Sequence, residues 1–168
     1  MGSLDFNADE IFEMAQQIER NGARFYRRAG SAARAAGNKA FFLKLAAMED
    51  AHEKVFARMR EELTAAERMK RIPDPENQAP AYLRAWADQQ VFDVRSDPAA
   101  KITGSEGPED ILRMAIGMEK DSIVFYLGMK HAVPERMGKA RVEEIIQEEM
   151  RHIDLLSREL QTLSHQPL

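Results

Sequence analysis

The stretch "LAAMEDAHEKVF" (residues 45–56) places Glu49 and His52 inside a run that otherwise has the apolar spacing of an amphipathic helix. In alternating steps of four and three residues, the spacing of a helix-bundle seam, its stripe runs through Leu45, Glu49, His52 and Phe56. A glutamate and a histidine three residues apart share one face of a helix, so both side chains are expected in the core. Such a pair on its own also fits the surface of a helix, and its meaning depends on the rest of the chain.

The chain repeats itself after 100 residues. The segment "IFEMAQQIERNGARFY" (residues 11–26) aligns without a gap with "ILRMAIGMEKDSIVFY" (residues 111–126). Within the predicted seams, the same offset matches Glu19 with Glu119, Glu49 with Glu149 and His52 with His152. Apolar matches are common between amphipathic helices, whereas three polar matches in one register are not. The two halves are therefore predicted to be copies of one helical hairpin.

Helical periodicity predicts four helices, over residues 8–35, 39–71, 108–133 and 135–163. The predicted end signals are Asn7 and Asn38 as N-caps, Gly37 as a stop, Pro108 in a first turn and Pro134 as a break. The connection 72–107 carries a short helix-like piece at 79–92. A helix of 30 residues is about 45 Å long, so a crossover along a bundle needs a connection of this length. The sequence thus predicts an all-α, single-domain chain (1–168) with the ferritin-like form of the four-helix bundle.

Each predicted seam contains one glutamate and no lysine or arginine. Burying one ionised carboxylate costs several kcal/mol, and four close together also repel one another. Protons or bound cations must offset this charge, and two divalent ions would balance four carboxylates. One glutamate from each of two helices and a Glu-x-x-His pair from each of the other two is the arrangement of carboxylate-bridged di-iron and di-manganese centres in bundle cores.

The composition narrows the function classes further. The 168 residues include no cysteine, which excludes disulfides, thiolate nucleophiles, iron–sulfur clusters and Cys-ligated metals in this chain. The formal net charge of −4 gives no reason to expect a nucleic acid partner, and the basic cluster Arg20, Arg24, Arg27 and Arg28 is interpreted as a solvated helix face. No window approaches the roughly 18 apolar residues of a membrane span, and the start "MGSLDFNADE" lacks the features of a secretory signal. A cytoplasmic location without membrane partners is expected.

Four segments carry a family resemblance: "QIERNGARFY" (17–26), "AAMEDAHEKVF" (46–56), "GMEKDSIVFY" (117–126) and "QEEMRHIDLL" (147–156). With them the chain resembles the ferritin-like superfamily, and within it the rubrerythrin-type di-iron domains, over essentially all four helices. The resemblance implies two metal ions, iron or alternatively manganese or zinc, held by Glu19, Glu49, His52, Glu119, Glu149 and His152. By the same resemblance, Glu49 and Glu149 would bridge the two ions. Tyr26 and Tyr126 each follow a ligand glutamate by seven residues, so their hydroxyls are expected either to reach carboxylates across the bundle or to pack in the core.

The resemblance also implies an activity, namely reduction of hydrogen peroxide or O₂ with electrons from an external donor, in a homodimer. Tyr82 and Trp86 on the crossover add to the expectation of a dimer, because these aromatic side chains are expected to pack against another surface. The chain departs from rubrerythrins in two respects, since it has Ser122 where they carry a further carboxylate, and it lacks the cysteines of a rubredoxin domain. Ferroxidase activity with iron storage or metal handling, and a non-catalytic metal-binding bundle, remain alternative functions at this point.

Overall fold

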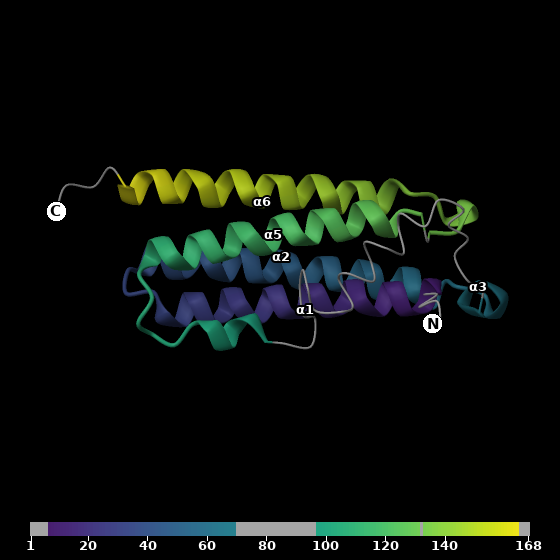
Figure 1. Cartoon of the computed structure of the whole chain (residues 1–168), viewed down its shortest axis with the longest axis horizontal. Helices are drawn as coiled ribbons and strands as arrows, with labels where there is room; N and C mark the ends of the chain where they lie inside the picture. Colours follow the sequence, from purple (N-terminus) through teal and green to yellow (C-terminus); the bar gives the residue numbers. More distant parts are fainter. Residues whose placement is uncertain (1–6, 70–96, 132, 165–168) are drawn as a thin grey trace, which may run out of the picture.

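The computed structural model describes residues 7–69, 97–131 and 133–164. The four long helices are α1 (Ala8–Ala32), α2 (Ala36–Glu61), α5 (Pro108–Met129) and α6 (Ala140–Ser164) (Figure 1). The short elements are α3 (Ala65–Met69) and the 3-10 helices η1 (Pro98–Lys101) and η2 (Glu135–Met137).

The long helices form two antiparallel hairpins that lie along a common axis (Figure 1). Helix α1 packs on α2, and α5 packs on α6; between the hairpins, α1 contacts α5 and α2 contacts α6. This arrangement is a four-helix bundle, and it confirms the predicted all-α architecture for the described part of the chain. The helix-like piece predicted at 79–92, with Tyr82 and Trp86, lies outside the described residues.

Three of the predicted end signals act as expected, and one of them, Pro134, lies in the break between α5 and α6. The Asn7 side chain accepts a hydrogen bond from the Glu10 backbone N–H at 2.9 Å, and the Glu10 carboxylate accepts one from the Asn7 N–H at 3.0 Å. This reciprocal capping box satisfies two amides at the start of α1. Pro108 is the first residue of α5, where its missing N–H and fixed φ are tolerated.

The predicted boundary between the first two helices is wrong. Helix α1 ends at Ala32, and α2 already begins at Ala36, so that Gly37 and Asn38 lie inside α2 instead of between the helices. Gly37 is exposed, and a Cβ at this position would meet no atom within 4 Å. A glycine inside a helix costs only about 1 kcal/mol relative to alanine, which the alanine-rich surroundings tolerate.

The other three boundaries also differ from the prediction. Helix α2 ends at Glu61 instead of continuing to residue 71, because Thr64 caps the separate helix α3 through a hydrogen bond of 2.9 Å from its N–H to the Glu67 carboxylate. Helix α5 ends at Met129, and α6 begins at Ala140 instead of residue 135. The intervening turn contains η2 and Gly138, whose φ of +68° lies in the left-handed region that favours glycine.

Two apolar clusters fill the bundle, and a polar layer separates them along every long helix. One cluster includes Phe12, Phe56, Met59, Met129 and Ile145; the other includes Phe25, Phe42, Leu45, Leu112 and Leu156. The predicted seams are buried as expected except at Ala33, Leu160 and Leu163, near the helix ends, which are partly exposed. The core therefore supports the polar layer from both sides. Within the described ranges, no helix combines the length and apolarity needed to cross a membrane.

Candidate metal centre

The structure brings all six predicted ligand side chains into the polar layer. Glu19 comes from α1 and Glu119 from α5, while α2 and α6 each contribute a glutamate and a histidine one turn apart. Each residue is at most 4% exposed, and Glu149 and His152 are fully buried. Carboxylates and imidazoles are seldom buried in this density unless something neutralises them.

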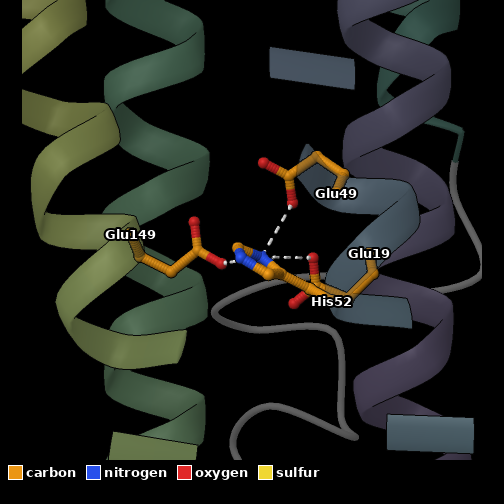
Figure 2. Close-up of side chains that lie close together, drawn as sticks. All are labelled: Glu19, Glu49, His52 and Glu149. Atoms are coloured by element: carbon orange, nitrogen blue, oxygen red, sulfur yellow. Dashed lines mark ion pairs between the residues drawn. The ribbon is translucent and has the colours of Figure 1, made fainter. Parts of the chain in front are cut away.

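One half of the layer is centred on His52. Its Nδ1 lies 2.9 Å from Glu149 Oε1, 3.5 Å from Glu19 Oε2 and 4.0 Å from Glu49 Oε2 (Figure 2). The picture shows these carboxylates converging on the imidazole from three helices. Each of the four side chains can offer a ligand atom such that all four atoms lie within 4.8 Å of one another. These four side chains provide enough ligand atoms to hold one metal ion.

The second half is centred on His152 and mirrors the first. Its Nδ1 lies 2.9 Å from Glu149 Oε2, 3.2 Å from Glu49 Oε1 and 3.4 Å from Glu119 Oε1. Glu49 and Glu149 belong to both groups, and Glu149 offers one oxygen to each histidine. The two half-sites are thus adjacent and share two carboxylates, which is the arrangement that a bridging role requires.

Several ligand atoms are shielded from solvent and have no hydrogen-bond partner within residues 7–69, 97–131 and 133–164. Those atoms are Glu19 Oε2, Glu49 Oε1, both carboxylate oxygens of Glu149, His52 Nδ1 and both ring nitrogens of His152. An unsatisfied buried polar atom costs about 1–3 kcal/mol, and more when it is charged. Two divalent cations would satisfy the oxygen and Nδ1 atoms together, with six protein ligands and open positions for further ligands. The residues present therefore fit a dinuclear centre, and their oxygen-rich set with one histidine per ion suits iron or manganese.

Protons stabilise the centre when no metal is bound. Burial, followed by repulsion from Glu49 and Glu119, raises the pKa of Glu149 to about 8. Burial also raises the pKa of Glu49 well above its ordinary value. Burial alone would lower the pKa of His52, but the nearby carboxylates of Glu149 and Glu19 raise this pKa to about 12. Glu149 and His52 therefore hold protons at neutral pH.

The two terminal glutamates differ in their titration. Burial and the charge of Glu149 raise the pKa of Glu19. Burial would raise the pKa of Glu119 as well, but the nearby, positively charged His152 lowers the pKa overall. The Tyr26 hydroxyl, which donates to Glu119 Oε1, lowers this pKa too.

Each terminal glutamate is held by a tyrosine from the opposite hairpin. The Tyr26 hydroxyl donates to Glu119 Oε1, and the Tyr126 hydroxyl donates to Glu19 Oε1. Burial raises the pKa of both tyrosines well above the ordinary value, so they remain protonated donors. Of the two sequence-based expectations for these residues, the structure shows the contact with carboxylates across the bundle.

The position one turn after each terminal glutamate is small for different reasons in the two halves. A Cβ added at Gly22 would lie 3.3 Å from the Glu49 carboxyl group, so a larger side chain would press on this shared ligand. Ser122, the equivalent residue, donates its hydroxyl hydrogen bond to the Met118 carbonyl at 3.0 Å on its own helix. Gly22 therefore leaves room for the Glu49 carboxylate, and the Ser122 hydroxyl is directed to its own helix.

A seventh side chain, which the seam pattern does not include, contacts the centre. Glu148 Oε2 lies 2.7 Å from His52 Nε2, the ring nitrogen on the far side from the ligand oxygens. The sequence places Glu148 on the flank of the seam, where a charged side chain usually faces solvent. Its position directly before the shared Glu149 is the one signal for this contact in the sequence.

Comparison with known proteins agrees with the fold. No family model and no curated protein sequence matches the chain. A solved structure from Thermotoga maritima, described as a "putative ferritin-like diiron-carboxylate protein", matches with a TM-score of 0.75 and 23% sequence identity, over 94% of this chain and 96% of that one. The predicted ferritin-like fold is thereby confirmed. At this level of identity the likeness extends to the fold, and the site must be argued from its own geometry.

Proposed function

We propose that the chain is a non-haem di-iron oxidoreductase of rubrerythrin type that reduces hydrogen peroxide or O₂. The observation that supports this most directly is the pair of four-residue ligand groups that share Glu49 and Glu149. The described similarity of the fold to a protein named for a diiron-carboxylate centre is in keeping with it. The metal ions at this centre are proposed to be iron, with manganese or zinc as other possible occupants.

Bound iron would supply the electrons, one from each of two Fe(II) ions, and reduction of one H₂O₂ to two H₂O consumes two electrons and two protons. The side chains hold and orient this centre. The neutral histidines bind without adding charge, and the shared glutamates keep the two positions close together. Tyr26 and Tyr126 each hold one oxygen of a terminal glutamate. For Glu19 the other oxygen, Oε2, is the one that lies near His52.

A small oxidant is proposed to bind at the positions of the metal ions that the six protein ligands leave open. Gly22 leaves room for the shared Glu49 carboxylate, and the Ser122 hydroxyl, which is turned to its own helix, adds no ligand. The apolar clusters on both sides exclude bulk water from the layer, which strengthens the electrostatic interactions within it. The described residues include no cysteine or redox group other than this centre, so the proposal requires an external electron donor.

Ferroxidase action with iron handling is the second candidate. It is favoured by Ser122, because a hydroxyl that bonds to its own helix contributes no ligand where rubrerythrins have a carboxylate. Oxidised iron would then be held by fewer charges and released more readily. A homodimer also remains a proposal, motivated by the resemblance and by Tyr82 and Trp86.

Metal content and single-turnover kinetics test the proposal. Protein reconstituted with Fe(II) without oxygen should contain two ions per chain and should react with H₂O₂ faster than with O₂ in a stopped-flow experiment, with iron retained after re-reduction. Glu49→Gln should abolish the reaction, while Glu53→Gln on the same helix, which removes an ion pair of 3.0 Å with Arg20, should leave it intact. Iron lost after one oxidation would support ferroxidase action instead, and a content of one ion or fewer would contradict the dinuclear centre.

A further inference from the structure

The two halves of the metal centre differ on the outer side of their histidines. His52 Nε2 is bound by the Glu148 carboxylate at 2.7 Å, whereas His152 Nε2 is buried and has no hydrogen-bond partner among the residues that the structure describes. The repeat explains the difference, because the residue that corresponds to Glu148 in the first half is Met48. A thioether is at most a weak acceptor and cannot replace a carboxylate.

A surface cavity of about 450 Å³ adds a second difference. It lies between α2 and α6 and is lined by Ala51, His52, Val55, Arg58, Glu62, Arg141, Glu144, Ile145 and Glu148. His52 is the one ligand of the centre among these residues, and His152 has no exposed surface. The half-site of His52 therefore borders the solvent through Glu148, and the half-site of His152 is enclosed.

We propose that Glu148 is a positioning residue for one half of the centre, and that it makes the half-site of His52 the first to bind a metal ion. The proposal rests on the metal centre of the proposed function, and concerns the order in which its two halves fill.

The physical reason lies in how an imidazole binds a metal. A carboxylate that accepts the hydrogen bond of the distal N–H fixes the tautomer and the orientation of the ring and makes the other nitrogen a better donor. Loss of such a partner typically lowers metal affinity by about 10–100-fold. In this chain the Glu148 carboxylate holds His52 Nδ1 toward Glu19, Glu49 and Glu149, and His152 has no such support.

Titration with Co(II) followed by its visible absorption tests the order. The full-length protein, freed of metal, should bind two ions in two resolved steps. Glu148→Gln should weaken the first step by about 10-fold and leave the second step and the final content of two ions unchanged, and Glu148→Asp should restore part of the loss. Glu144→Gln is the matched control, because Glu144 lines the same cavity one turn away and is exposed.

Two further variants assign the steps to the half-sites. His52→Ala should remove the tight step and His152→Ala the weak one. Two ions that bind with equal affinity, a Glu148→Gln protein with both steps unchanged, or loss of the tight step in His152→Ala would each overturn this inference while leaving the dinuclear centre in place. Failure of the unaltered protein to bind two ions would overturn the proposed centre itself.

Discussion

Without metal ions, the protein should become less stable as the pH rises from 5 to 8. The perturbation is removal of the ions by a chelator, which leaves the clustered glutamates and histidines dependent on protons. Glu149 is the group for which the size of the effect can be worked out, because burial and repulsion raise its pKa to about 8 in the folded state, against about 4.3 in an unfolded chain.

The sign follows from the proton count in the two states. Between pH 5 and 7 the unfolded chain has lost the Glu149 proton while the folded chain retains it, so each pH unit costs about 1.4 kcal/mol, or about 3 kcal/mol over this range. Glu49 has a raised pKa and contributes with the same sign. His52, with a pKa of about 12, adds a further loss once the pH exceeds its unfolded value near 6.5. Glu119 has a lowered pKa, so its contribution is complete above the unfolded value and stays constant in this range.

Urea unfolding of the metal-free protein, followed by circular dichroism at pH 5, 6, 7 and 8, measures this dependence. Glu149→Gln should reduce the slope by about 1.4 kcal/mol per pH unit, because the amide does not titrate. Glu144→Gln, an exposed change on the same helix, should keep the original slope. Metal-free protein that grows more stable between pH 5 and 8, or a Glu149→Gln protein with the unaltered slope, would refute the reasoning.

Three other outcomes are expected from the same geometry. Binding of two divalent ions near pH 7 should release protons, including those of His52 and Glu149, whose pKa values are raised to about 12 and about 8. Calorimetry in buffers of different ionisation enthalpy can measure this release, and a release near zero would contradict the raised pKa values. Glu49→Gln or Glu149→Gln should weaken binding of both ions, whereas Glu19→Gln or Glu119→Gln should mainly weaken binding of one ion. Equilibrium dialysis of each variant measures this difference. Equal effects in all four variants would rule out shared ligands. Gly22→Ala should lower metal affinity while the helix content is kept, because the new methyl group lies 3.3 Å from the Glu49 carboxyl group, and an unchanged affinity would show that the carboxylate can yield.

The position of the polar layer could be predicted from the sequence because two independent regularities agree on it. The steps of three and four residues fix which side chains share a face, and the offset of 100 residues fixes which layer of one hairpin meets which layer of the other. Neither depends on where a helix begins or ends. Glu19 and Glu149 therefore meet around His52 although the boundaries of all four helices were predicted less well.

The helix boundaries were harder because the local signals are weak or compete. At the first turn, Ala35 occupies the N-cap without a side-chain hydrogen bond, so no polar residue marks the start of α2. At the end of α2, the sequence does contain a marker, since Thr64 and Glu67 form the Thr-x-x-Glu pattern of a capping box. The apolar periodicity continues through this point and hides it. Helix propensity alone cannot separate one long helix from two that follow each other.

The difference between the two half-sites could not be predicted by comparing the two repeats. The ligand residues match between the repeats, so this comparison predicts two equal half-sites. The difference lies at a position that does not match, Glu148 against Met48, on the flank of the seam where solvent-facing residues are the usual expectation. Only the packing of α6 beside α2 brings Glu148 to the outer nitrogen of His52. A mismatch next to a matched ligand is therefore the place to search for asymmetry in a duplicated metal site, since a change there can alter one ion while both ligand sets stay intact.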